Sequence, residues 1–145
     1  MRAADSYFAD MFEVDELRPY DRLGREKIEE LSRTFYGLVY ADTEPSFRGM
    51  FPRDKEMAIQ NQYEFLIQRF GGPPVYSERK GHPALRARHA RFSITVDHAA
   101  KWLEYMRQAM ETVGIPDDLR EAMYEYFENS AAFMVNTDED GSRIY

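Results

Sequence analysis

The fold is organised around the stretch GGPPVYSERKGHPALRARH, which runs from Gly71 to His89. Its two glycines predict the end of a helix, and the two prolines that follow them prevent that helix from continuing. We expect the residues from there to Pro83 to form a long irregular loop, a feature that often serves function in compact domains. Pro83 then begins a short helical turn, in which Leu85 and His89 share one face.

Amphipathic patterns on both sides of this stretch predict long helices. Apolar residues recur with helical spacing over residues 25–40, 54–70 and 96–113, and again from residue 116 onward. Asp54 and Thr95 precede the second and third of these segments, where their side chains suit N-cap positions. No run of residues alternates between apolar and polar with strand punctuation. The sequence therefore predicts an all-α fold.

The length of 145 residues suits one domain with one core, and 43% of the residues are hydrophobic, which is enough to fill it. We expect this domain to span residues 23–136. Residues 1–22 are mixed and acidic, and they predict an extension that is packed loosely or partly disordered, with a short helix that Asp5 caps and that runs to Phe12. Residues 137–145 predict a polar, mobile tail.

Aromatic residues outside the regular stripes leave two alternatives open. The turn region 41–53 contains Phe47 and Phe51. An aromatic side chain in a polar loop usually fills the core, but Phe51 is also placed to line a pocket. On the last helix, Tyr124 and Phe127 either join a dimer face or cap the core. The sequence therefore allows a monomer or a homodimer.

Composition excludes several classes of protein. The chain has no cysteine, so disulfide frameworks and cysteine metal sites are impossible, and a reducing compartment fits. A formal net charge of −7 argues against nucleic-acid binding, which needs a basic face. No stretch approaches the ~20 apolar residues of a membrane span, and the N-terminus does not resemble a secretory signal. We therefore expect a soluble, cytoplasmic protein that binds neither nucleic acid nor membrane.

Four polar side chains are candidates for chemistry, each with a structural alternative. His89 is either a core histidine or a metal ligand; its spacing from His82 matches no zinc signature, but haem iron needs only one protein histidine. Tyr36, Gln62 and Trp102 are either satisfied polar groups at the edge of the core or hydrogen-bonding groups in a dry pocket. No nucleophile stands with a base, and the glycine pair lacks the residues of a phosphate loop. The basic residues near His89 either pair with an anion or are solvated.

These landmarks together resemble the group II truncated haemoglobins. The match rests on Gly71-Gly72-Pro73, on the run YSERKGHP from Tyr76 to Pro83, and on Leu85-Arg86 and Arg88-His89. It also rests on Phe35-Tyr36 in the first long helix and on Trp102-Leu103 in the third. The run from Ala58 to Phe65 and the GGPP segment resemble the plant-type members in particular. The resemblance covers residues 20–135 and keeps the spacing between the landmarks.

The resemblance implies a truncated globin fold, a two-on-two helical sandwich around haem b, with His89 as the proximal ligand of the iron. It implies that Tyr36, Gln62 and Trp102 line the distal side, where Ala58 takes the place of the distal histidine of ordinary globins. It also implies a set of apolar haem contacts and two partners for the propionates: Phe51, Phe65, Leu66, Phe92 and Met106 as the contacts, and Arg88 and Tyr76 as the partners.

The function that the resemblance implies is the binding of O₂ and NO at the iron. Donors in a dry distal pocket stabilise the partial negative charge of O₂. Very slow O₂ release suits chemistry such as NO dioxygenation, or a peroxidase-like activity, with an external reductase because the chain has no flavin or nicotinamide motif. The alternatives are a non-enzymatic O₂ or NO sensor or store, which would also take ligands such as CO, and a haem-free all-α interaction domain.

Overall fold

The computed structural model describes residues 13–144. A short helical stretch, residues 13–17, comes first, and the expected helix from Asp5 to Phe12 lies outside the described residues. Residues 13–144 contain an isolated bridge between Thr137 and Arg143 and no strand. The named helices are α2 (Pro19–Ala41), α3 (Pro45–Arg48), α4 (Lys55–Arg69), α5 (Val75–Lys80), α6 (Leu85–His89), α7 (Val96–Thr112) and α8 (Asp117–Met134).

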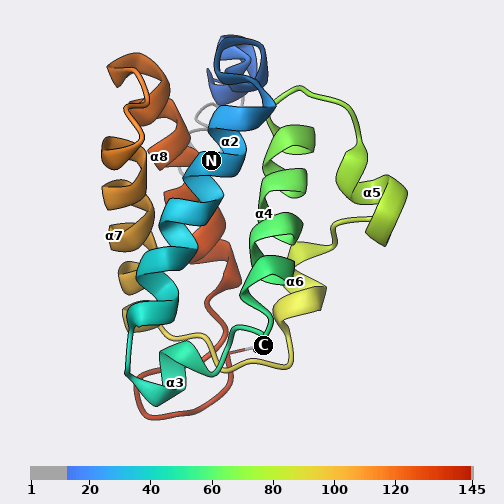
Figure 1. Ribbon diagram of the computed structural model, residues 1–145. Helices are drawn as coiled ribbons and strands as arrows, with labels where there is room; N and C mark the ends of the chain where they lie inside the picture. The colour runs from blue at the N-terminus through green and yellow to red at the C-terminus, as the bar shows by residue number, and fades with distance from the viewer. Residues whose placement is uncertain (1–12, 145) are drawn as a thin grey trace, which may run out of the picture.

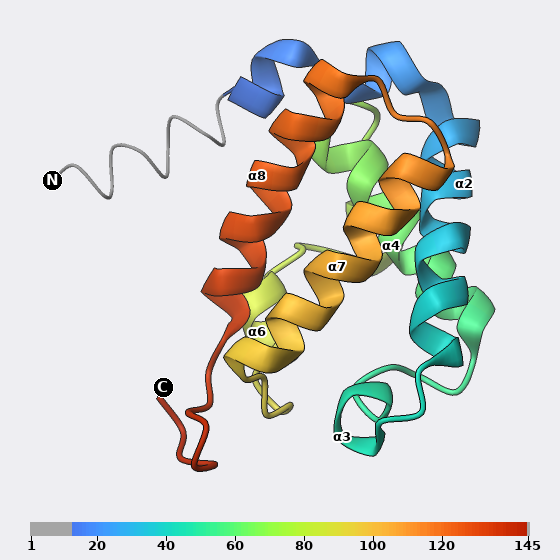
Figure 2. The ribbon, with the colours of Figure 1, turned by 90° about the vertical axis from the view of Figure 1, so that its left-hand side faces the viewer.

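The four long helices form two pairs that pack on each other. α2 packs on α4 and on α7, and α7 packs on α8 (Figures 1 and 2). The short α5 packs on α4, and α6 packs on α8. Fully buried side chains from all four long helices fill the space between the pairs: Ile28, Leu31, Phe35, Ile59, Leu66, Met106, Met110 and Leu119. The expected all-α, two-on-two fold is confirmed.

The predicted helix starts carry the expected caps. The Asp54 carboxylate accepts the Met57 backbone N–H (3.2 Å), and the Thr95 hydroxyl accepts the His98 backbone N–H (3.2 Å). Each bond satisfies an N–H that has no partner within its own helix. Gly24 interrupts α2 with φ 78° and ψ 169°, so the regular part of that helix begins at the expected place.

Two short helices replace loops that the sequence analysis expected to be irregular. α5 lies inside the stretch between the glycine pair and Pro83, and α3 lies inside the turn region 41–53. α5 is fixed to α4 by Gln68, whose side chain accepts the Ser77 backbone N–H (2.9 Å) and donates to the Ser77 hydroxyl (2.8 Å). It also buries Tyr76. The proline pair therefore ends α4 and allows a second short helix to begin after it.

Both ends of the described chain are anchored. Val14 is fully buried in the core, although the sequence analysis expected a loosely packed extension. After α8 the chain folds back: Asn136 and Thr137, the first residue of the expected tail, are buried, whereas residues 138–144 are exposed. Phe127 is 3% exposed and packs in the core, which resolves its two alternatives in favour of the core.

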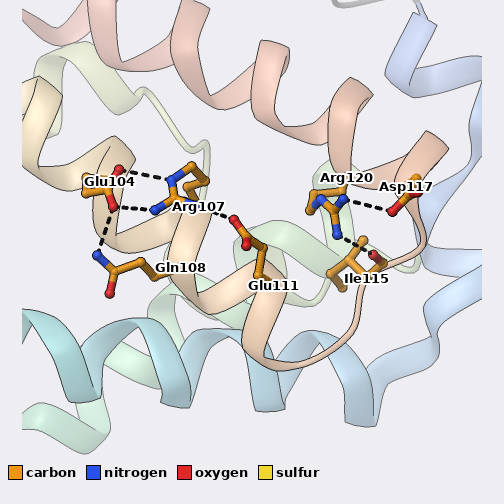
Figure 3. Close-up of polar contacts among 7 residues, drawn as sticks. All are labelled: Glu104, Arg107, Gln108, Glu111, Ile115, Asp117 and Arg120. Atoms are coloured by element: carbon orange, nitrogen blue, oxygen red, sulfur yellow. Dashed lines mark hydrogen bonds and ion pairs between the residues drawn. The ribbon is translucent and has the colours of Figure 1, made fainter.

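The outer face of α7 and the start of α8 carry charge pairs of short sequence separation. Figure 3 shows Arg107 between Glu104 and Glu111, each within one helical turn of it. Arg120 pairs with Asp117 (2.8 Å) in the same way. Exposed pairs of this kind contribute little to stability, because solvent and salt screen them. This face therefore has the character of a solvated surface.

None of the helices in residues 13–144 combines the length and the apolar character that a bilayer crossing requires.

Candidate functional site

His89 is the last residue of α6, and its side chain is half-buried. Its ring nitrogen Nδ1 lies 2.6 Å from the carbonyl oxygen of Leu85. A carbonyl only accepts, so Nδ1 carries the proton and donates it. The neutral ring then leaves Nε2 with a free lone pair, the form in which histidine binds a metal. The hydrogen bond also fixes the orientation of the ring.

Arg88 holds the turn that precedes α6. Its guanidinium donates to the carbonyl oxygens of Pro83 (2.7 Å), Lys80 (2.8 Å) and His82 (3.0 Å). The Nη1 group makes no hydrogen bond to any residue of the described chain, so it is the part of Arg88 that is left for a carboxylate. The sequence analysis gave Arg88 only the propionate role, and the structure adds this structural one.

Tyr36 is a buried residue whose hydroxyl has no hydrogen-bond partner within residues 13–144. It lies on α2 and is 9% exposed. Burial raises the pKa of the Tyr36 hydroxyl well above its ordinary value, so the group remains protonated near neutral pH. The ring of Phe51 lies 6.0 Å from the Tyr36 ring. A buried donor that the protein does not use is suited to a ligand.

Gln62 has a partner that the sequence analysis missed. The buried hydroxyl of Ser32 on α2 lies 2.8 Å from Gln62 Oε1 and 3.0 Å from the carbonyl oxygen of Ile59. One hydroxyl proton serves only one of these acceptors at a time. When Ser32 donates to Oε1, the Gln62 amide nitrogen has no partner in residues 13–144 and remains a free donor. Ser32 thus fixes one end of the Gln62 amide.

Trp102 lies on α7 and is half-buried. Its ring packs between Phe35 of α2 (4.9 Å between centroids) and Phe127 of α8 (5.5 Å). Its indole N–H makes no hydrogen bond in the described chain. Tyr36, Gln62 and Trp102 therefore come from three helices that meet, but they are not hydrogen-bonded to one another as a network.

The other predicted haem contacts fall into small groups. Phe65 packs edge-on against Tyr76 (5.8 Å), and the Arg88 guanidinium lies 5.7 Å from the centre of the Tyr76 ring. Phe92 lies 6.5 Å from the His89 ring. Leu66 and Met106 are buried in the core from α4 and α7. The structure thus places an aromatic and basic group beside α5 and α6, as a cofactor with an apolar face and acidic edges requires.

The residues present fit a haem better than a metal ion held by protein ligands alone. Within residues 13–144 no three or more His, Asp or Glu side chains stand close enough to hold a metal ion. His89 instead offers a single neutral nitrogen, and Tyr36 offers an unused buried donor. A cofactor that brings its own four iron ligands needs only one such histidine.

A serine and a histidine meet outside this group. Ser46 Oγ lies 3.0 Å from His98 Nε2, and the Ser46 hydroxyl donates to Glu44 (2.6 Å). His98 Nδ1 accepts the Thr95 backbone N–H (3.2 Å), so the neutral ring carries its proton on Nε2. That nitrogen donates to Ser46 and has no lone pair to take its proton. The cluster fixes α3 to the start of α7 and lacks the base of a hydrolase.

Two cavities lie on either side of α6 and the segment that follows it. One, of about 330 Å³, opens between α6 and α8 and is lined by Leu85, Tyr126 and Phe133 among others. The other, of about 750 Å³, is lined by Phe92, Met50 and charged side chains of α7 and the C-terminal segment. Neither has His89, Tyr36, Gln62 or Trp102 in its lining. The segment around His89 thus has open space beside it.

Known proteins place the chain in one family. The family described as bacterial-like globin matches residues 18–136. The two-on-two hemoglobin-3 of Arabidopsis thaliana is 46% identical over 133 residues, which are 90% of this chain and 76% of that protein. Group 2 truncated hemoglobin YjbI of Bacillus subtilis is 41% identical over 125 residues, 86% of this chain and 93% of that protein.

Solved structures agree with this assignment. The group II truncated hemoglobin of Bacillus anthracis has a TM-score of 0.78 and 40% identity, and the alignment covers 83% of this chain and 98% of that one. The truncated oxygen-avid haemoglobin of Bacillus subtilis has a TM-score of 0.76 and 42% identity over 81% of this chain and 98% of that one. The family implies a haem cofactor and the binding of small gases such as O₂. The chain belongs to the group II truncated haemoglobins and resembles their plant members.

Proposed function

We propose that this haemoglobin uses His89 as the iron ligand of haem b and binds O₂ and NO for chemistry between them. The observation that carries the proposal is the hydroxyl of the largely buried Tyr36, which has no partner in the described chain. When bound, haem supplies the iron at which gas ligands bind. Arg88 Nη1 and the Tyr76 side chain are the proposed partners of the haem propionates. The proposed apolar contacts of the haem are Phe51, Phe65, Leu66, Phe92 and Met106.

The distal donors determine how firmly a ligand with partial negative charge is held. Tyr36 stays protonated, and the Gln62 amide nitrogen and the Trp102 indole N–H are also unused within residues 13–144. A hydrogen bond to a charged group contributes about 1.5–3 kcal/mol, which slows ligand loss by roughly ten- to a hundredfold. The Bacillus subtilis relative is named oxygen-avid, which supports slow O₂ release here.

Slow release favours a reaction of O₂ over its transport. The proposed reaction is NO + O₂ + one electron → nitrate: the O–O bond breaks, both of its oxygens become bonded to nitrogen, and the added electron supplies the negative charge of nitrate. The electron comes from an external reductase, since the chain has no flavin or nicotinamide motif, and a cytoplasmic location would supply it. A sensor or store is the alternative, and it predicts ligand binding without NO consumption.

An absorption spectrum after haem addition tests the cofactor, and a resonance Raman spectrum of the same protein tests its ligand. We expect a Soret band from the wild-type protein and the loss of the iron–histidine vibration in His89→Gly, with recovery on adding imidazole. A protein without a Soret band would be the haem-free interaction domain, and the proposal would fail.

Stopped-flow O₂ dissociation tests the distal donors. We expect Tyr36→Phe and Trp102→Phe each to release O₂ faster by roughly ten- to a hundredfold. An unchanged rate in Trp102→Phe would remove Trp102 from this role. NO consumption with a supplied reductant then separates the two functions, because a sensor or store would consume a negligible amount.

A further inference from the structure

The short helix that carries His89 is not held in place by buried side chains. α6 has five residues, and none of them is buried. Cavities lie between α6 and α8 and beside the residues that follow α6. α6 contacts α8, where the Arg86 guanidinium lies 4.4 Å from the centre of the Phe133 ring, and hydrogen bonds at its two ends add to this partly exposed contact. On the N-terminal side, Arg88 provides them through the carbonyls of the 80–83 turn.

On the C-terminal side, the segment after α8 provides them. The Arg143 guanidinium donates to the carbonyl oxygens of Ala90 (2.7 Å) and Phe92 (3.2 Å). The Asn136 amide donates to the Phe92 carbonyl (3.0 Å) and accepts the Ile94 backbone N–H (2.9 Å). Figure 1 shows the C-terminal segment running beside the chain that leaves α6.

These hydrogen bonds are suited to fixing the path of the main chain directly after His89. All of them reach backbone atoms of residues 90–94, directly after His89. They therefore hold the main chain independently of the side chains of these residues. Asn136 is 6% exposed, and both polar atoms of its amide are used. The Thr137 and Arg143 backbones pair in an isolated bridge, and the Ile144 N–H donates to the Asn136 carbonyl (2.8 Å), which closes the segment on itself. Arg143 lies beyond the part of the chain that the globin family matches.

We propose that Asn136 and Arg143 are positioning residues for His89, and that the segment 136–144 is a clamp on the proximal side of the haem site. The clamp holds residues 90–94, and through them the end of α6, and so fixes the position and orientation of the His89 ring that would hold the iron. This inference rests on the proposed function, because it needs His89 to be the iron ligand.

The test uses the full chain reconstituted with haem. Arg143→Ala removes two donors from an exposed side chain, and Asn136→Ala removes the buried pair of bonds. Arg107→Ala is the matched control, because it removes an arginine that pairs only with the exposed side chains of Figure 3. The measurements are the iron–histidine stretching band of the ferrous protein by resonance Raman, and the rate of haem transfer to excess apomyoglobin.

We expect both clamp variants to shift or broaden the iron–histidine band and to lose haem roughly two- to tenfold faster, the change that one net hydrogen bond produces. Arg107→Ala should match the wild type, and Arg143→Lys should recover part of the effect. An unchanged band in Arg143→Ala would overturn the proposal, even with faster haem loss, because the segment would then stabilise the fold without positioning His89. Failure of the proposed function looks different: His89→Gly would then keep the wild-type band.

Discussion

Arg79 and Glu64 form an ion pair between α5 and α4 whose removal should cost measurable stability. Arg79 Nε on α5 lies 2.6 Å from Glu64 Oε1 on α4, and Arg79 Nη2 donates to Asn61 Oδ1 (2.6 Å). Gln60 donates to the second oxygen of Glu64 (3.1 Å). The Glu64 side chain is 10% exposed, whereas that of Arg79 is 37% exposed. The change to make is Arg79→Met, which keeps most of the apolar stem and removes the charge.

The magnitude follows from the burial of Glu64. Two charges about 4 Å apart attract each other by about 4 kcal/mol at an effective dielectric constant of about 20. Desolvation offsets much of this attraction in the intact pair, but removing Arg79 leaves the carboxylate buried with Gln60 alone. We therefore expect Arg79→Met to lower the free energy of unfolding by about 2–3 kcal/mol. The double change Glu64→Met with Arg79→Met removes the buried charge as well, and it should recover most of the loss.

Urea unfolding followed by circular dichroism measures the effect. The control is Arg107→Met, since Arg107 pairs with two carboxylates on an exposed face and its loss should cost much less stability. A loss below about 0.5 kcal/mol in Arg79→Met, or an equal loss in Arg79→Met and Arg107→Met, would refute the argument from burial.

Three further changes test other parts of the structure. Gly24→Ala should destabilise the protein by about 1–3 kcal/mol, because φ 78° and ψ 169° suit only glycine. The control Gly37→Ala lies in the regular part of α2 with equally open space around it, and it should stabilise the protein by about 0.5–1 kcal/mol. Equal urea midpoints for the two variants would contradict this. The pKa of Asp42 is held at about 2, below its ordinary 3.8, by hydrogen bonds from the Tyr105 hydroxyl, the Glu44 backbone N–H and Lys101. The stability that these bonds contribute is therefore present above pH 4 and is lost as the pH falls from about 4 to about 2. Tyr105→Phe should therefore destabilise at pH 6 and converge with the wild type near pH 2, and a gap that does not depend on pH would count against it. Ser32→Ala should change O₂ dissociation by roughly two- to tenfold, because the Gln62 amide loses its anchor, and an identical stopped-flow rate would show that Ser32 has no such role.

The long helices could be predicted because each repeats its apolar pattern over several turns and has a cap that the sequence shows. Asp54 and Thr95 accept the N–H groups expected of them. The short helices α3 and α5 could not be predicted in the same way, because a helix of four or six residues is too short to show a period of 3.6. Their stability comes from contacts such as the one between Gln68 and Ser77, which only the folded chain brings together.

The candidate site was predictable as a set of residue types and less so as an arrangement. The carbonyl of Leu85 as the partner of His89 Nδ1 becomes visible only in the structure. Ser32 was missed, although it stands four residues before Tyr36 on a helix face that is otherwise apolar. A serine in such a stripe needs a partner when it is buried, and that requirement points to a polar residue on the facing helix. Gln62 also needs a hydrogen-bond partner if it is buried. The needs of Ser32 and Gln62 together would have predicted that these two residues pair.

The C-terminal clamp shows why some positioning residues have no recognisable sequence pattern. Asn136 and Arg143 bind backbone atoms, and every residue offers the same backbone atoms, so the sequence of residues 90–94 contains nothing that marks them as partners. The polar segment that contains Arg143 reads as a mobile tail for the same reason. The requirement becomes visible only once α6 is known to end at His89 with no buried side chain, because the carbonyls beyond a helix end need donors from elsewhere. An exposed arginine near a chain end can thus bear on the iron ligand, as long as it reaches the main chain beside that ligand.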